Sequence, residues 1–313
     1  MSKVLTIGEI LVEIIATERG NGFRAPVPLI GPFPSGAPAI FIDQVGKLGQ
    51  DCAIISRVGD DDFGHVNIDR LKADNVDVSG IDIDPEGTTG SAFVRYRDDG
   101  SRAFVFNIRH SACGTIELTG RAASLVEECT HLHVMGTSLY APSVVESVLA
   151  AIRAIKAKGG TVSFDPNLRP EILGSPGMRE ALNIVIGETD VFLPSGDELF
   201  LFTEAKTEAD AVKELLDTGI NAIVAKRGEA GATYYDATQT LSVPGFTVDE
   251  VDPTGAGDCF GATFVTFWLA GAAPAEALLY ANASGARAVT REGPMEGAST
   301  RAELDAFIAT QRG

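Results

Sequence analysis

The sequence predicts an α/β protein with a doubly wound, mostly parallel sheet that is flanked by helices. Short apolar runs typical of strands buried on both faces occur at residues 4–7, 54–58, 161–164, 191–193 and 222–225. Longer segments with helical apolar spacing lie between some of them, for example at residues 145–155. Because parallel strands need long crossover connections, this alternation favours a parallel sheet with helices on both faces.

A different pattern between residues 88 and 112 predicts a β-hairpin outside that sheet. Apolar and polar residues alternate at 92–97 and 103–107, and the turn-forming sequence Asp-Asp-Gly-Ser separates the two runs. A hairpin that interrupts an alternating chain of strands and helices is expected to cover a binding site as a lid.

Composition places the chain among globular enzymes and excludes several partners. It has 313 residues, of which 45% are hydrophobic and 22% charged, so one large domain with an appendage is expected. The net charge of −18 argues against nucleic acid or an anionic membrane as a partner, since both are bound through basic patches. Any phosphate site must therefore be built locally.

Targeting and cysteine patterns point to a cytoplasmic protein. No apolar run approaches the ~18 residues of a membrane-spanning helix, and the first residues enter a strand pattern rather than a signal-peptide pattern. The four cysteines, Cys52, Cys113, Cys129 and Cys259, are widely spaced without a Cys-x-x-Cys motif. We therefore expect reduced thiols rather than a zinc site or a disulfide framework.

Residues 251–260 combine an anion site with a carboxylate. Gly255, Ala256 and Gly257 leave backbone N–H groups unobstructed at the start of an apolar helix, where the helix dipole favours an anion. Asp258 beside them would repel a passively bound phosphate, but it suits a base that deprotonates a hydroxyl attacking one. The segment predicts phosphoryl transfer; the alternative is a glycine-rich helix start with an acid that complements the dipole.

Two better-known glycine motifs do not fit this segment. A Walker A loop needs Gly-Lys-Ser/Thr, whereas Asp258 and Cys259 follow Gly257. A dinucleotide fingerprint needs a third glycine where Phe260 stands. A nucleotide-dependent oxidoreductase is therefore disfavoured.

Residues 252–260, Asp-Pro-Thr-Gly-Ala-Gly-Asp-Cys-Phe, resemble the C-terminal signature of the phosphofructokinase-B, or ribokinase-like, family of carbohydrate kinases. Pro253 replaces the usual threonine of Asp-Thr-x-Gly-Ala-Gly-Asp-x-Phe. The other motifs extend the resemblance over the whole chain. It implies one ribokinase-like domain over residues 1–313, with a discontinuous β-lid formed by residues 11–34 and 88–112. It also implies that Asp258 is the catalytic base and that the amides of residues 255–257 stabilise developing charge.

Sugar-binding residues are expected near the first strand. Glu9 and Glu13 follow it, and carboxylates at the end of a buried strand commonly accept hydrogen bonds from sugar hydroxyls; a solvated strand face is the alternative. The resemblance places Glu13 at the family's sugar-contacting acid. Gly36 and Ala37 resemble the family's sugar loop with two departures, because Ser35 stands at its first glycine and Ile40 at its asparagine. One polar sugar contact is therefore missing or supplied elsewhere.

Further substrate contacts are implied by two other stretches. Arg109 matches the stretch in which 2-keto-3-deoxygluconate kinases carry a substrate-binding arginine. Asn167 and Arg169 belong to an element resembling Asp-x-Asn-x-Arg, which faces the sugar and the transferred phosphate. A loop salt bridge is the alternative role of Arg169.

The resemblance places a metal and a nucleotide at the ends of later strands. Glu198 matches the acid that organises Mg²⁺ through water, although an ordinary helix N-cap also explains this stretch. The residues expected to bind the nucleotide are Ser195, Lys226, Gly228, Gly231, Gly257 and Asn282. Close helix packing is the alternative role for the small-residue helix around Asn282.

Together these features predict an ATP-dependent kinase that phosphorylates a primary hydroxyl of a small keto sugar. ATP and Mg²⁺ are the implied cofactors, a monovalent cation is an open addition, and a homodimer through the lid is expected. The substrate stays open between a ketohexose, such as fructose or tagatose, and 2-keto-3-deoxygluconate. The alternatives are another small sugar or a nucleoside as substrate, and a non-catalytic sugar-binding protein.

Overall fold

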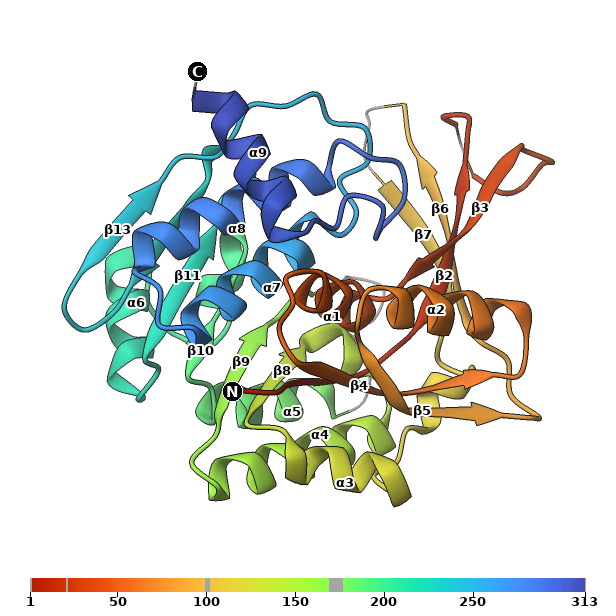
Figure 1. Cartoon of the computed structure of the whole chain (residues 1–313), viewed down its shortest axis with the longest axis horizontal. Coiled ribbons are helices and arrows are strands. Elements are labelled where there is room, and N and C mark those ends of the chain that lie inside the picture. Colours follow the sequence, from red (N-terminus) through yellow and green to blue (C-terminus); the bar gives the residue numbers. More distant parts are fainter. Residues whose placement is uncertain (1, 21, 99–101, 169–176, 313) are drawn as a thin grey trace.

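A large sheet forms the centre of the molecule (Figure 1). The computed structural model describes the chain except residues 1, 21, 99–101, 169–176 and 313. Within the described residues the sheet has the strand order β13-β12-β11-β10-β9-β8-β1-β4-β5. Its strands are β1 (Val4–Ile7), β4 (Cys52–Gly59), β5 (Asp77–Asp84), β8 (His131–Met135), β9 (Thr161–Asp165), β10 (Val191–Phe192), β11 (Ala222–Lys226), β12 (Ala232–Tyr235) and β13 (Thr240–Val243).

Pairing in this sheet is parallel from β5 to β11 and antiparallel only at β12 and β13. The five apolar runs in the sequence all fall on its parallel strands, so the prediction of a doubly wound, mostly parallel sheet is confirmed.

Helices cover both faces of the sheet, because successive strand residues point to opposite sides. On one side Leu5 and Ile7 belong to a core that α3, α4, α5 and α6 close; on the other, Val4 joins a core with α1, α2, α7 and α8. The helices are α1 (Ala37–Lys47), α2 (Asp62–Ala73), α3 (Gly120–Glu128), α4 (Pro142–Ala157), α5 (Met178–Gly187), α6 (Glu208–Asp217), α7 (Ala256–Leu269), α8 (Pro274–Ala288) and α9 (Arg301–Arg312). Short 3-10 turns are η1 (Ala112–Thr115), η2 (Gly136–Ser138), η3 (Gly196–Phe200) and η4 (Gly228–Ala230).

A second sheet of four strands stands beside the main one, at the right of Figure 1. Its order is β3 (Leu29–Ser35), β2 (Leu11–Ala16), β6 (Gly90–Tyr96) and β7 (Arg102–Asn107). The strands β6 and β7 pair antiparallel, as the alternating pattern predicted, whereas β2 and β6 pair parallel. Both segments expected in the lid thus supply strands to one small sheet.

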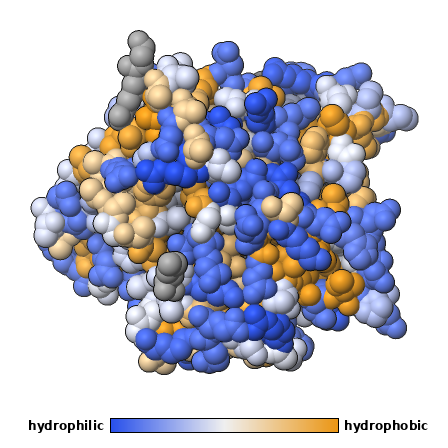
Figure 2. Space-filling view, viewed as in Figure 1, coloured by the Kyte–Doolittle hydropathy of each residue, from blue (hydrophilic) through white to orange (hydrophobic). Residues whose placement is uncertain are grey.

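Hydrophilic residues cover much of the face in Figure 2, and the chain carries a net charge of −18. No helix in the described part of the chain is long and apolar enough to cross a membrane.

Candidate functional site

The site is organised around the start of helix α7. Gly255 caps this helix with a φ of 80°, and a Cβ atom there would lie 2.3 Å from the carbonyl oxygen of Pro294. Only glycine adopts this backbone conformation readily and fits the space. The following residues, Ala256, Gly257 and Asp258, form the first turn of the helix, where backbone N–H groups lack intrahelical partners.

Asp258 is held in a defined orientation. Its side chain is 6% exposed, and the side-chain amide of Asn167 donates a hydrogen bond of 3.1 Å to its Oδ1. Asn167 itself has a φ of 40°, which is uncommon for a residue with a side chain, and its backbone N–H donates to Asp165 Oδ1 at 3.2 Å. The two acceptors thus fix both the backbone and the side chain of Asn167.

Two cavities meet at this helix start. Ala256 and Gly257 line a large cavity of about 750 Å³, and Gly255 and Asp258 line a smaller one of about 60 Å³. The carboxylate therefore faces one compartment while the small residues beside it border the other. This arrangement suits the transfer of a group from a ligand in one cavity to a ligand in the other.

Most of the predicted sugar residues gather in the smaller cavity. Glu13, Gly36, Ala37, Asn167 and Asp258 all line it. Ser35, which replaces the first glycine of the family's sugar loop, donates a hydrogen bond of 2.9 Å from its Oγ to Glu13 Oε1. Ile40 also lines the cavity, so the missing asparagine leaves an apolar wall there.

Glu9, which the sequence analysis grouped with Glu13 as an acid near the first strand, also lines the smaller cavity. Glu9 is 4% exposed, and the hydroxyl of Ser138 donates to its Oε2 at 2.6 Å. Burial raises the pKa of Glu9, and the hydrogen bond from Ser138 opposes that shift. The cavity thus holds three carboxyl groups.

The two predicted arginines are not found among the described lining residues. Arg109 is exposed and lies outside the lining of both cavities, and Arg169 lies outside the described residues. Arg102 lines the smaller cavity instead, together with Phe104 and Phe106. The period-two spacing of these three residues on β7 indicates that they share one face of the strand, but it does not indicate which face turns toward the cavity.

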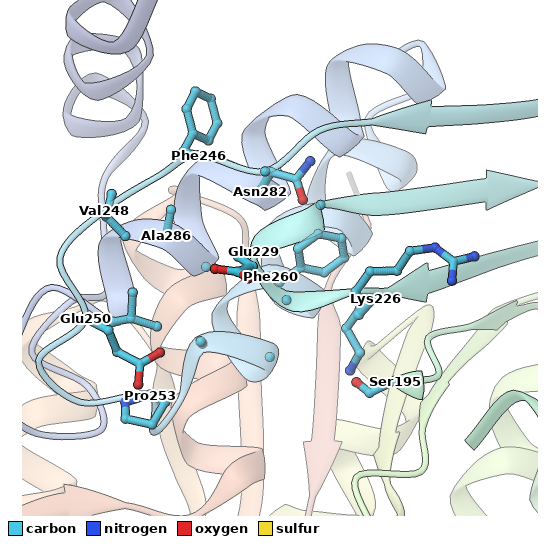
Figure 3. Close-up of a pocket in the computed structure, with 18 of the residues that line it drawn as sticks. Ser195, Lys226, Glu229, Phe246, Val248, Glu250, Pro253, Phe260, Asn282 and Ala286 are labelled. Atoms are coloured by element: carbon cyan, nitrogen blue, oxygen red, sulfur yellow. The ribbon is translucent and has the colours of Figure 1, made fainter. Parts of the chain in front are cut away.

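The predicted nucleotide residues gather in the larger cavity, shown in Figure 3. Lys226 points toward Ser195 at one end, and Phe246, Val248 and Ala286 border the other. The residues of the prediction that line it are Ser195, Lys226, Gly228, Gly231, Gly257 and Asn282. The cavity therefore combines a cationic end with an apolar end.

Asn282 has a structural role in addition to bordering this cavity. Its side-chain amide donates hydrogen bonds to the carbonyl oxygens of Val243, at 3.1 Å, and Pro244, at 3.2 Å. These bonds hold the chain after β13 against α8. Its Nδ2 is therefore engaged by the protein.

Two carboxylates that contact Ser195 and Lys226, residues lining the larger cavity, also organise the structure there. Glu198 accepts hydrogen bonds of 2.8 Å from the backbone N–H groups of Leu168 and Ser195, the latter as part of a capping box. Burial and the nearby Asp165 raise the pKa of Glu198. Asp165 forms an ion pair with Lys226. The N-cap role weighed for this stretch is thus present, and within the described residues no cluster of three or more His, Cys, Asp and Glu is arranged to hold a metal.

Comparison with known proteins identifies relatives along nearly the whole chain. The model of the pfkB family carbohydrate kinases matches residues 1–301. Fructokinase-2 of Zea mays is 32% identical over 316 residues, which cover 98% of this chain and 94% of the maize protein.

Solved structures agree with this match. An E. coli protein provisionally described as ribokinase II is 49% identical and has a TM-score of 0.95, covering 99% of this chain and 100% of that one. A complex under the same description contains ATP and Mg²⁺, with 49% identity, a TM-score of 0.93 and the same coverage. A double mutant of fructokinase from Vibrio cholerae, solved with fructose, ADP and potassium, is 29% identical with a TM-score of 0.84, covering 98% of both chains.

The tight turn before α7 can be tested by comparing two glycines. Gly255→Ala is expected to lower the free energy of unfolding by clearly more than Gly271→Ala. Both glycines have a positive φ, of 80° and 74°, which costs about 1–2 kcal/mol for alanine. Only at Gly255 would the new methyl group also meet a backbone oxygen, whereas nothing lies within 4 Å at Gly271. Urea unfolding of both variants measures the difference; equal losses would contradict the close approach to Pro294.

Proposed function

The chain belongs to the pfkB family of carbohydrate kinases, and on that premise we propose that it transfers the γ-phosphate of ATP to a primary hydroxyl of a neutral ketohexose. Membership confirms the family resemblance of the motifs and makes the protein a sugar phosphotransferase. The observation that carries the proposal is the position of Asp258, which faces the smaller cavity from a helix start whose small residues border the larger one.

Charge in the smaller cavity favours a neutral sugar over a sugar acid. Glu9, Glu13 and Asp258 present carboxyl groups that accept hydrogen bonds from hydroxyls and repel a substrate carboxylate. Among the described residues that line this cavity, Arg102 carries the guanidinium group. Its Nη1 donates a hydrogen bond to Thr254 Oγ1 at 2.7 Å. The fructokinase of Zea mays and the fructose complex from Vibrio cholerae support the same class. Fructose and tagatose are therefore the proposed substrates, and 2-keto-3-deoxygluconate is the alternative.

The larger cavity fits a nucleotide triphosphate. Its volume of about 750 Å³ and apolar end accommodate a base and ribose, while Lys226 and the amides at the start of α7 provide positive charge for phosphates. The E. coli relative solved with ATP and Mg²⁺ supports these cofactors. Asp165 and Glu198 would hold Mg²⁺ through water, and the metal would neutralise phosphate charge. The potassium-bound fructokinase supports a monovalent cation as a further ligand.

The chemistry proposed for Asp258 is general-base catalysis. The Asn167 amide holds one carboxylate oxygen, so the group is oriented to accept the proton of the sugar hydroxyl. As that proton leaves, the hydroxyl oxygen bonds to the γ-phosphorus, and the bond between this phosphorus and the β-phosphate oxygen breaks. The N–H groups of the first turn of α7 stabilise the developing negative charge, and Lys226 at the larger cavity adds a positive charge.

The four-stranded sheet is proposed to act as a lid within a single kinase domain of residues 1–313. Phe104 and Phe106 line the sugar cavity, with ring centroids 5.1 Å apart, and would exclude water from the transferred phosphate. Leu29 and Val105 on the same sheet are 46% and 50% exposed, and we propose that a second copy of the chain covers them. A cytoplasmic location is proposed for the enzyme, in keeping with its proposed phosphate donor, ATP.

A panel of acceptors tests the proposal directly. ADP release is measured with D-fructose, D-tagatose, 2-keto-3-deoxygluconate, D-ribose and adenosine at equal concentrations. The largest kcat/KM is expected for a ketohexose. A preference for the sugar acid, ribose or the nucleoside would overturn the proposed substrate while leaving the kinase assignment in place.

Replacing Asp258 with Asn is expected to reduce kcat by at least about 100-fold with a much smaller change in KM. Asn is nearly isosteric and still caps a helix, but it cannot accept a proton at neutral pH; general bases contribute ~10²–10⁴-fold. Steady-state kinetics measures the effect, and circular dichroism checks folding.

A matched control is Asp62→Asn, which also changes an acid in the first turn of a helix, α2, but outside both cavities. Its turnover should equal that of the wild type. If Asp258→Asn also kept turnover within a few-fold of wild type, Asp258 would only complement the helix dipole and the proposed mechanism would be wrong.

Arg109→Met is expected to leave the KM for the ketohexose within about twofold of wild type, because Arg109 is exposed and outside the cavity lining. Arg102→Met is the positive comparison, since Arg102 lines the cavity. If Arg109 instead pairs with a sugar carboxylate, its loss should cost about 2–5 kcal/mol of binding to 2-keto-3-deoxygluconate. A corresponding increase in the KM for the sugar acid would indicate that Arg109 contacts the substrate.

A further inference from the structure

Two side chains of the four-stranded sheet reach the turn that precedes α7. The hydroxyl of Tyr96, on β6, donates a hydrogen bond of 3.1 Å to Asp252 Oδ1. Arg102, on β7, donates from Nη1 to Thr254 Oγ1 at 2.7 Å. Tyr96 and Arg102 are directly paired across the two antiparallel strands. One end of the hairpin therefore contacts two positions of the same turn.

Asp252 organises this turn from inside. It is 2% exposed, its Oδ1 also accepts the backbone N–H of Thr254 at 2.9 Å, and its Oδ2 accepts the N–H of Gly293 at 3.1 Å. Burial and the neighbouring Asp252 raise the pKa of Tyr96, so its hydroxyl stays protonated and donates. Gly255, at the start of α7, follows this turn.

The same hairpin borders the smaller cavity, which is the proposed sugar site. Arg102 and Phe104 line the smaller cavity, and the Arg102 guanidinium carbon lies 5.7 Å from the centre of the Phe104 ring. A sugar that packs against Arg102 and Phe104 would contact β7, the strand that holds the turn before α7 through Arg102. The amides just beyond the turn border the nucleotide cavity.

We propose that Tyr96 and Arg102 are positioning residues that couple the sugar cavity to the anion-binding start of α7, through Asp252 and Thr254. The proposal rests on the sugar kinase function stated above. By linkage, sugar tightens the binding of nucleotide by the same factor by which nucleotide tightens the binding of sugar. The coupling aligns the amides for phosphate when the hairpin has closed on a sugar, which disfavours transfer to water.

Tyr96→Phe tests the coupling, because it removes one hydroxyl and keeps the ring. The dissociation constant of a non-hydrolysable ATP analogue is measured with and without D-fructose, in wild type and variant. The ratio of the dissociation constant without D-fructose to the constant with D-fructose is expected to fall toward one in Tyr96→Phe. Where the wild-type ratio is large enough, the fall should be on the order of tenfold, which is the size of one hydrogen bond to a carboxylate. The kcat should fall while the analogue's affinity without sugar stays the same.

Tyr280→Phe is the matched control. The Tyr280 hydroxyl also donates to a carboxylate, that of Asp305, but it lies outside both cavities. Its ratio should equal that of wild type. A Tyr96→Phe ratio equal to wild type, with fructose binding intact, would overturn the coupling.

A second measurement separates this proposal from the proposed substrate. Hydrogen exchange of the amides of residues 254–257 is followed without any sugar, and Tyr96→Phe should speed it by about tenfold relative to wild type and Tyr280→Phe. If wild type binds no ketohexose, the proposed substrate is wrong, and the exchange rates still test whether Tyr96 positions the start of α7. Unchanged exchange in Tyr96→Phe would contradict a positioning role of Tyr96.

Discussion

The left-handed conformation of Gly255 is the constraint on which the site depends. It lets the chain turn against Pro294 and begin α7 between two cavities, so that the first turn of one helix borders both. A side chain at this position would move the helix start away from Pro294. The carboxylate of Asp258 and the amides beside it would then lose their common position, since both belong to the same turn.

A lysine lies beside the start of α7 in a chain of net charge −18. Lys226 lines the larger cavity with its amine paired to Asp165, and a hypothetical Cβ at Gly257 would be 3.8 Å from that amine. The lysine is thus held beside the helix start, where the dipole adds to its field. Because the pair is buried, salt screens its interaction less than that of a surface pair.

The sequence predicted the parts of the site that lie on short motifs and missed those that depend on pairing between distant strands. Asn167 and Asp258 could be placed because each motif follows a recognisable strand or starts a helix. Arg102 could not, because its position over the cavity follows from the parallel pairing of β2 with β6, which joins segments that β3, α1, β4, α2 and β5 separate in the chain. Local periodicity cannot reveal which face of a hairpin such pairing turns inward.

Two acids, Asp165 and Glu198, hold the backbone around Asn167. A φ of 40° is uncommon for a residue with a side chain, although Asn adopts it more readily than most, and two carboxylates hold the backbone here. Asp165 accepts the N–H of Asn167, and Glu198 accepts the N–H of Leu168. This backbone conformation directs the Asn167 amide at Asp258. Asp165 and Glu198 therefore also help to orient Asp258, which faces the smaller cavity. Replacing either backbone acceptor is therefore expected to disturb the orientation of Asp258.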